Sequence, residues 1–228
     1  MLTSGNTTIA SSTGGSFNAY MSVPSNPNGR GVLILHEIFG VNSAMRALAD
    51  RFARDGYHAM VPELFWRTAP GVELNYSRAE TLRAMEMVSE YQSEDGIVDT
   101  WDAVQHLSAI ANVADVALVG LCLGGLLAYR TASRHPVAAA ISFYSTDINK
   151  HMDEMVSIGC PLAFHYGAKD RFIPASLVDE VDAAVKQRGA GEVFVYPEGE
   201  HGFYTRGSEQ DMQLAHARVL TLIGHQPQ

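Results

Sequence analysis

The sequence predicts an α/β fold in which a mostly parallel sheet carries helices on both faces within a single domain. Short apolar, β-branched runs alternate with longer helix-like segments along the chain, and this alternation is typical of βαβ units. The 228 residues can bury an ample core for one domain of this class. No internal repeat and no linker-like tract divides them.

Local patterns predict the individual elements. Apolar runs bounded by turn residues predict strands at Gly31–His36, His58–Pro62, Val116–Gly120, Ala138–Phe143, Pro161–Tyr166 and Glu192–Tyr196. Helical periodicity predicts helices at Ser43–Asp55, Ser77–Tyr91, Asp95–Ile110, Gly124–Arg134, Ala175–Arg188 and Ser208–Ile223. Phe17–Val23 is predicted as an antiparallel edge strand. We therefore expect one domain over residues 1–228, with a core from about 17 to 223 and a polar N-terminal segment, 1–16.

Composition restricts the possible partners and the location. The net charge is −9 and no basic cluster is present, which argues against a nucleic-acid surface. The N-terminus lacks the apolar stretch of a secretory signal, and no run of about 18 apolar residues predicts a membrane span. The two cysteines, Cys122 and Cys160, are predicted to be unpaired, which suits a reducing compartment. We expect a cytoplasmic protein, as a monomer or weak homodimer.

A sharp turn between a strand and a helix is predicted around Cys122. The apolar run ends at Gly120, Cys122 follows two residues later, and two glycines precede a helix-like stretch. This is the G-x-S-x-G nucleophile elbow with cysteine in place of serine, where glycines allow a tight bend and close helix packing. A buried structural cysteine is the alternative interpretation. The flanking strand and helix favour a nucleophile.

Asp170 and His201 are the predicted partners of Cys122. A nucleophilic cysteine needs a base and a third group that orients the base, and both residues follow predicted strands, whose carboxyl ends meet at one edge of a parallel sheet. The order nucleophile, acid, histidine is that of α/β-hydrolases. Alone, Asp170 could be a turn residue and His201 an ordinary loop histidine. No histidine spacing suggests a metal site.

Four segments together resemble the dienelactone hydrolase family: Leu35–Asn42 (L-H-E-I-F-G-V-N), Gly120–Gly125 (G-L-C-L-G-G), Gly167–Asp170 (G-A-K-D) and Gly199–Phe203 (G-E-H-G-F). The resemblance extends from about Phe17 to Ile223. It implies an α/β-hydrolase fold, a Cys-Asp-His triad, no cofactor, and cleavage of a small-molecule lactone or activated ester.

The resemblance also implies roles for the segment after the first core strand. In the family, the glutamate at the position of Glu37 contacts the resting cysteine and takes part in forming the thiolate. Otherwise Glu37 would cap the helix that begins at Ser43, or pair with an arginine. The backbone N–H groups of Ile38 and Leu123 are the expected oxyanion hole.

The substrate-binding residues depart from the family pattern. The family binds its substrate carboxylate with two arginines, and the second stands four residues after the triad histidine. Here that position is Thr205, and Arg206 follows it. For the first arginine, Arg78 and Arg83 are near the expected position. A helical wheel places Arg78 on the stripe of Leu82 and Met85, and Arg83 among glutamates on a solvated face.

The sequence also offers candidate pocket residues and leaves three hypotheses for the function. Phe39, Tyr144 and Phe203 are candidates for the wall of an apolar substrate pocket, or for the core. The leading hypothesis is a cysteine-dependent ester or lactone hydrolase. A broad-specificity esterase or thioesterase is the second, and a non-catalytic binding protein that retains the fold is the third. An intact set of Cys122, Asp170 and His201 argues against the third.

Overall fold

Strands and helices alternate along the chain from the third strand onward, and the predicted α/β class is confirmed. The computed structural model describes residues 2–113 and 115–224. These group into an N-terminal unit, residues 1–116, and a C-terminal unit, residues 117–228. Three elements begin and end at the predicted residues, namely His58–Pro62, Ala175–Arg188 and Glu192–Tyr196.

A mixed sheet with the strand order β1-β2-β4-β3 forms the centre of the N-terminal unit. Strand β2 pairs antiparallel with β1 and with β4, whereas β3 and β4 are parallel. The elements are β1 (Thr3–Ala10), β2 (Ser16–Val23), β3 (Arg30–Leu35), α1 (Ser43–Arg54), β4 (His58–Pro62), α2 (Arg78–Ser89) and α3 (Ser93–Ala111).

The predicted edge position of Phe17–Val23 is wrong, because β1 pairs along the outer side of β2. In β1 only Ile9 is buried, opposite Phe17, and most of the other residues are exposed. A strand that is exposed on both faces carries polar side chains at nearly every position. Its sequence therefore lacks the apolar alternation from which strands are predicted, and the polar segment 1–16 contains an unpredicted strand.

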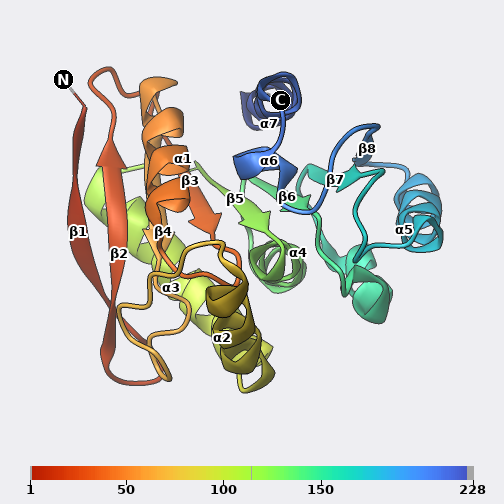
Figure 1. The fold of residues 1–228 in the computed structure, drawn as a ribbon. Helices are drawn as coiled ribbons and strands as arrows, with labels where there is room; N and C mark the ends of the chain where they lie inside the picture. The colour runs from red at the N-terminus through yellow and green to blue at the C-terminus, as the bar shows by residue number, and fades with distance from the viewer. Residues whose placement is uncertain (1, 114, 225–228) are drawn as a thin grey trace. The chain divides into compact units, whose positions relative to one another are not determined.

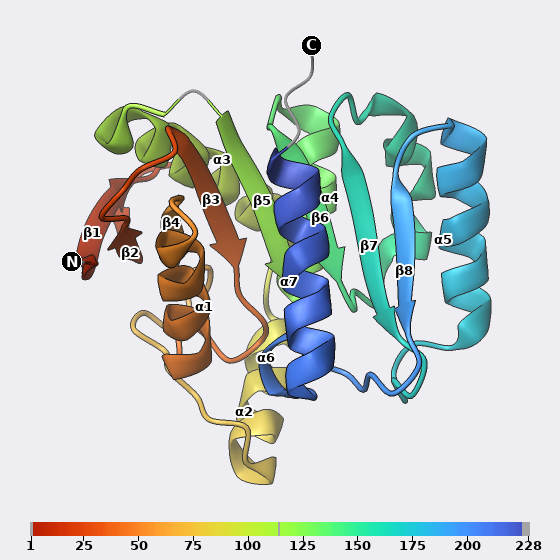
Figure 2. The same cartoon turned by 90° about the horizontal axis from the view of Figure 1, so that it is seen from above.

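Helices α1 and α3 cover opposite faces of this sheet (Figures 1 and 2). Successive side chains of a strand point to opposite faces, and β2 follows this rule. Tyr20 and Ser22 donate hydrogen bonds of 2.9 and 2.7 Å to Asp50 of α1. Phe17 faces the other way and stacks on Trp66, with 5.6 Å between the ring centroids.

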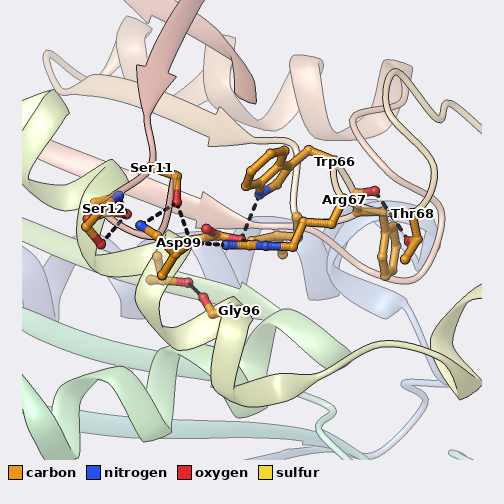
Figure 3. Close-up of polar contacts among 12 residues, drawn as sticks. Ser11, Ser12, Trp66, Arg67, Thr68, Gly96 and Asp99 are labelled. Carbon is orange, nitrogen blue, oxygen red and sulfur yellow. Dashed lines mark hydrogen bonds and ion pairs between the residues drawn. The ribbon is translucent and has the colours of Figure 1, made fainter. Parts of the chain in front are cut away.

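The buried carboxylate of Asp99 in α3 holds the loop that follows β4 (Figure 3). Trp66 Nε1 donates to its Oδ2 at 2.8 Å, and Arg67 forms an ion pair with the same oxygen. Arg67 also donates to Thr13 at 2.8 Å. Oδ1 of Asp99 has no hydrogen-bond partner among the described residues. Burial raises the pKa of Asp99, although Arg67 and Trp66 counteract this effect by stabilising the ionised form.

A parallel sheet with the strand order β5-β6-β7-β8 forms the C-terminal unit, and its β5 begins two residues before the unit boundary. Helix α7 lies on one face of the sheet, and α4 lies on the other (Figure 2). The elements are β5 (Asp115–Leu121), α4 (Leu123–Arg134), β6 (Ala139–Phe143), the 3₁₀ segment η1 (Ile148–Ser157), β7 (Leu162–Gly167), α5 (Ala175–Arg188), β8 (Glu192–Tyr196), α6 (Phe203–Arg206) and α7 (Glu209–Gly224).

Two short helical elements, η1 and α6, are absent from the prediction. Helix α6 has four residues and η1 is a 3₁₀ segment with a kink at His151, so neither presents a sustained helical period. None of the helices in the described part of the chain combines the length and the apolar character needed to cross a membrane.

Candidate active site

Cys122 stands at the junction of β5 and α4 in a backbone conformation that side chains rarely adopt. Its φ is 55° and its ψ is −112°. A Cβ atom at Gly120 would lie 1.9 Å from the carbonyl oxygen of Gly124, so the strand and the helix can approach only where residue 120 is glycine. The amide of Cys122 donates to Phe143 O in β6 at 2.9 Å. The predicted elbow is therefore present, with the thiol at its apex.

Asp170 lies in the turn after β7 and accepts two hydrogen bonds. Its Oδ1 accepts from the amide of Phe172 at 2.9 Å, and its Oδ2 accepts from Nδ1 of His201 at 2.7 Å. The Asp170 side chain has no exposed surface, and that of His201 is 18% exposed. The two loops are also joined through their backbones, because the amide of Lys169 donates to Gly199 O at 2.9 Å.

The imidazole of His201 interacts with Asp170 and Cys122 together. Burial lowers the pKa of His201, but hydrogen bonds to Asp170 and to Cys122, and the charges of both groups, raise it to about 10. Since Nδ1 is hydrogen bonded to Asp170, Nε2 is the ring nitrogen left for another partner. A histidine with this pKa is an imidazolium at neutral pH, which is the form that stabilises a neighbouring thiolate.

Two predicted pocket residues, Tyr144 and Phe203, are buried in the C-terminal unit. Tyr144 follows β6 with φ at +39°, and its ring centroid lies 5.0 Å from that of His201. Phe203 packs on Tyr144 at 5.5 Å and on Tyr196 at 4.4 Å. Both side chains are almost without exposed surface. Tyr144 therefore borders the histidine, and Phe203 supports it from the core.

Arg206 is exposed at the end of α6, close to the histidine loop. Gly202 has φ at +86°, and a Cβ atom there would lie 1.8 Å from Nη2 of Arg206. The guanidinium thus rests on the residue that follows His201, although it stands one position later than the family pattern. Nη1 of Arg206 donates a hydrogen bond to Thr205 Oγ1 at 3.2 Å.

The segment Glu37–Phe39 belongs to the N-terminal unit and follows β3 after His36. Glu37 is 2% exposed and Phe39 is 8% exposed. Phe39 packs edge-on against Tyr76 at 4.7 Å and contacts Ala84 of α2, so its ring belongs to a local core rather than to an open wall. Ile38 is partly buried against the same cluster.

His36 holds the segment Glu37–Phe39 in place through two hydrogen bonds. Its Nε2 accepts from the amide of Leu64 at 3.1 Å, so its Nδ1 carries the proton and donates to Glu37 O. Burial lowers the pKa of His36 to about 4, and the ring is neutral at physiological pH. His36 therefore joins the loops after β3 and β4.

Arg78 is exposed in the first turn of α2. The stripe on which the helical wheel places it is also solvent-facing, since Leu82 and Met85 are 58% and 57% exposed. The buried position of α2 is Ala84. The apolar residues beside Arg78 are therefore not evidence that it faces a site.

The remaining groups concern the oxyanion hole, the second thiol and metals. Leu123 is the first residue of α4, where amides have no partner within the helix. Burial raises the pKa of Cys160 to about 11. Its thiol therefore stays protonated at neutral pH and is a poor nucleophile. Among the residues that the structure describes, no group of three His, Cys, Asp or Glu side chains could hold a metal ion.

Sequence reasoning missed Phe172, which lies against His201 with 5.1 Å between ring centroids. The available signal was a large apolar residue in an exposed turn, two positions after Asp170. The position alone does not reveal the contact, because the histidine comes from another loop.

Comparisons with known proteins place the chain in a family. The sequence model of the dienelactone hydrolase family matches residues 17–224. A carboxymethylenebutenolidase from a Pseudomonas species is 30% identical over 98% of this chain and 95% of its own. One from Cupriavidus pinatubonensis is 30% identical, with 94% of both chains covered. The crystal structure of a candidate dienelactone hydrolase from Klebsiella pneumoniae, 28% identical, matches 99% of this chain and all of its own with a TM-score of 0.86. The chain belongs to the dienelactone hydrolase family, has the α/β-hydrolase fold, and is a hydrolase of ester or lactone bonds.

Proposed function

We propose that this protein hydrolyses activated carboxylic esters and enol lactones of small molecules through a Cys122 thiolate and an acyl-enzyme. The observation that carries the proposal is the position of His201, whose Nδ1 is hydrogen bonded to Asp170 at 2.7 Å and whose pKa is raised by both Asp170 and Cys122. A base held between its orienting acid and a nucleophile is the arrangement that nucleophilic catalysis requires.

The reaction proceeds in two steps. The thiolate attacks the carbonyl carbon, the amide of Leu123 and that of Ile38 stabilise the oxyanion, and the alcohol or enolate leaves with a proton from His201. Water then attacks the thioester while His201 takes its proton, and the acid and the free thiol are released. In this proposal Glu37 takes part in forming the thiolate, as the family resemblance implies.

The nucleophile restricts the substrates. A thiolate leaves more readily than an alkoxide, so the tetrahedral intermediate of an unactivated ester reverts to substrate. Enol lactones and aryl esters have leaving groups that compete with the thiolate. The two free thiols favour a reducing compartment such as the cytoplasm.

A broad esterase with no preference for a substrate carboxylate is the second candidate. The observation in its favour is the displacement of both arginines, since Thr205 occupies the expected position and Arg78 lies on an exposed helix surface. A panel that pairs carboxylate-bearing lactones with neutral aryl esters distinguishes the two candidates by kcat/KM.

Replacement of Cys122 by alanine tests the mechanism. We expect hydrolysis to fall by at least about a thousandfold, because a nucleophile cannot be replaced by its partners, and the melting temperature to stay near that of the wild type. Mass spectrometry after mixing with an aryl ester should detect an acylated wild type and an unmodified variant. Activity of the variant within about tenfold of the wild type contradicts the proposal.

A further inference from the structure

We infer that Phe172 is a positioning residue for His201, and this inference rests on the proposed function of that histidine as the base. Phe172 is 52% exposed, so its ring does not serve the core. A single exposed apolar side chain is ordinary on a protein surface, so the meaning of Phe172 depends on what its ring contacts. That ring lies edge-on to the His201 imidazole, with an interplanar angle of 78°.

Phe172 contacts both members of the Asp170–His201 pair. The amide of Phe172 donates to Oδ1 of Asp170 at 2.9 Å and fixes the carboxylate. Its ring contacts the imidazole that the other carboxylate oxygen binds. The backbone contact survives any substitution except proline, whereas the ring contact does not. The two contributions can therefore be separated by changing the side chain alone.

A ring contact supplies a restraint that the Asp170 hydrogen bond does not. The hydrogen bond restrains the imidazole at Nδ1, whereas a packed ring restrains the plane of the imidazole as well. Tyr144 packs against the same imidazole at 5.0 Å with a tilt of 58°. With Phe172 also in contact, two aromatic rings restrict the plane of the imidazole and so the direction in which Nε2 points. Displacements of about 1 Å at a catalytic group can cost on the order of a hundredfold in rate.

The position of Arg171 is consistent with a ring that is held in place rather than free in solvent. Its guanidinium carbon lies 4.9 Å from the centroid of the Phe172 ring. Guanidinium groups stack favourably on aromatic faces, including exposed ones. The ring of Phe172 therefore has His201 and Arg171 as neighbours.

The test compares Phe172→Ala, Phe172→Leu and Phe172→Trp on two neutral aryl esters that differ in the size of the acyl group. Leu214→Ala is the matched control, since Leu214 is a 44% exposed apolar residue on α7. We expect alanine to lower kcat roughly tenfold for both esters with KM within about twofold of wild type. Tryptophan should restore most of kcat. Long-range ¹H–¹⁵N spectra should show broadened His201 signals in the alanine variant.

Three results overturn the inference. An unchanged kcat means that the ring does not position the base. A rise in KM that grows with the acyl group means that Phe172 contacts substrate instead. A lower melting temperature with normal kcat means a structural role. If Cys122→Ala remains active, the proposed function fails, whereas wild-type kinetics for Phe172→Ala beside an inactive Cys122→Ala rejects only the positioning role.

Discussion

In the proposed mechanism the charge on His201 depends on two partners, and only one of them survives the first chemical step. Asp170 would stay hydrogen bonded to Nδ1 throughout, whereas acylation of Cys122 would remove the contribution of Cys122 to the raised pKa of His201. The pKa then falls, and a neutral imidazole becomes available to take a proton from water. In this scheme the same residue is an acid before acylation and a base after it.

This scheme predicts how His201 titrates when Cys122 is changed. In the wild type the imidazolium should persist through neutral pH and titrate near 10. Cys122→Ser should lower that pKa, since serine removes the interaction by which Cys122 raises it, and Asp170→Asn should lower it as well. Imidazole ¹⁵N shifts followed by NMR measure the change. A pKa that stays the same in Cys122→Ser shows that the thiol does not control the charge of His201.

At the scale of the elements, Asp99 of α3 is a buried charge whose pKa gives a pH dependence with a definite sign. Its pKa in the folded protein is above the ordinary value of 3.8, so the folded protein binds this proton more tightly than the unfolded chain does. The resulting stabilisation is fully present below pH 3.8 and is lost as pH rises through the folded pKa. Asp99→Asn lacks this contribution.

The difference in melting temperature between the wild type and Asp99→Asn should therefore move in favour of the wild type as pH falls from 7 toward 4. Thermal melting followed by circular dichroism measures it, and the exposed Asp179→Asn on α5 controls for the loss of one negative charge. The opposite trend would mean that the ion pair with Arg67 outweighs the burial of the carboxylate.

Prediction from sequence succeeded for elements whose pattern reflects burial. Strand β4 has the predicted bounds because it is a short apolar run with four of its five residues buried, and helix α5 because it buries Leu177, Val181 and Val185 at helical spacing. Strand β1 escaped prediction because only Ile9 is buried. The loops around Asp170 and His201 were predicted from their position after strands. The left-handed φ of Tyr144 and the Phe172 contact were not, since they depend on tertiary packing that no local pattern encodes.

At the scale of the whole molecule, the net charge of −9 opposes the approach of an anionic substrate. Recognition of a substrate carboxylate therefore needs a local cation that outweighs this field. Arg206 rests on Gly202, the residue after His201, whereas Arg78 lies on an exposed surface of α2 beside exposed Leu82 and Met85. These placements favour Arg206 over Arg78 as the residue that binds the carboxylate.

Replacing Arg206 by glutamine should raise KM for carboxylate-bearing lactones by roughly ten- to a hundredfold, because a charge-assisted contact contributes about 1.5–3 kcal/mol. KM for neutral aryl esters should stay nearly constant. Lys186→Gln on α5 removes the same charge from an exposed position and reports the effect of the overall field alone. Arg78→Gln, measured in parallel, should behave like Lys186→Gln. If Arg206→Gln affects charged and neutral substrates equally, the arginine is structural and the protein is a broad esterase.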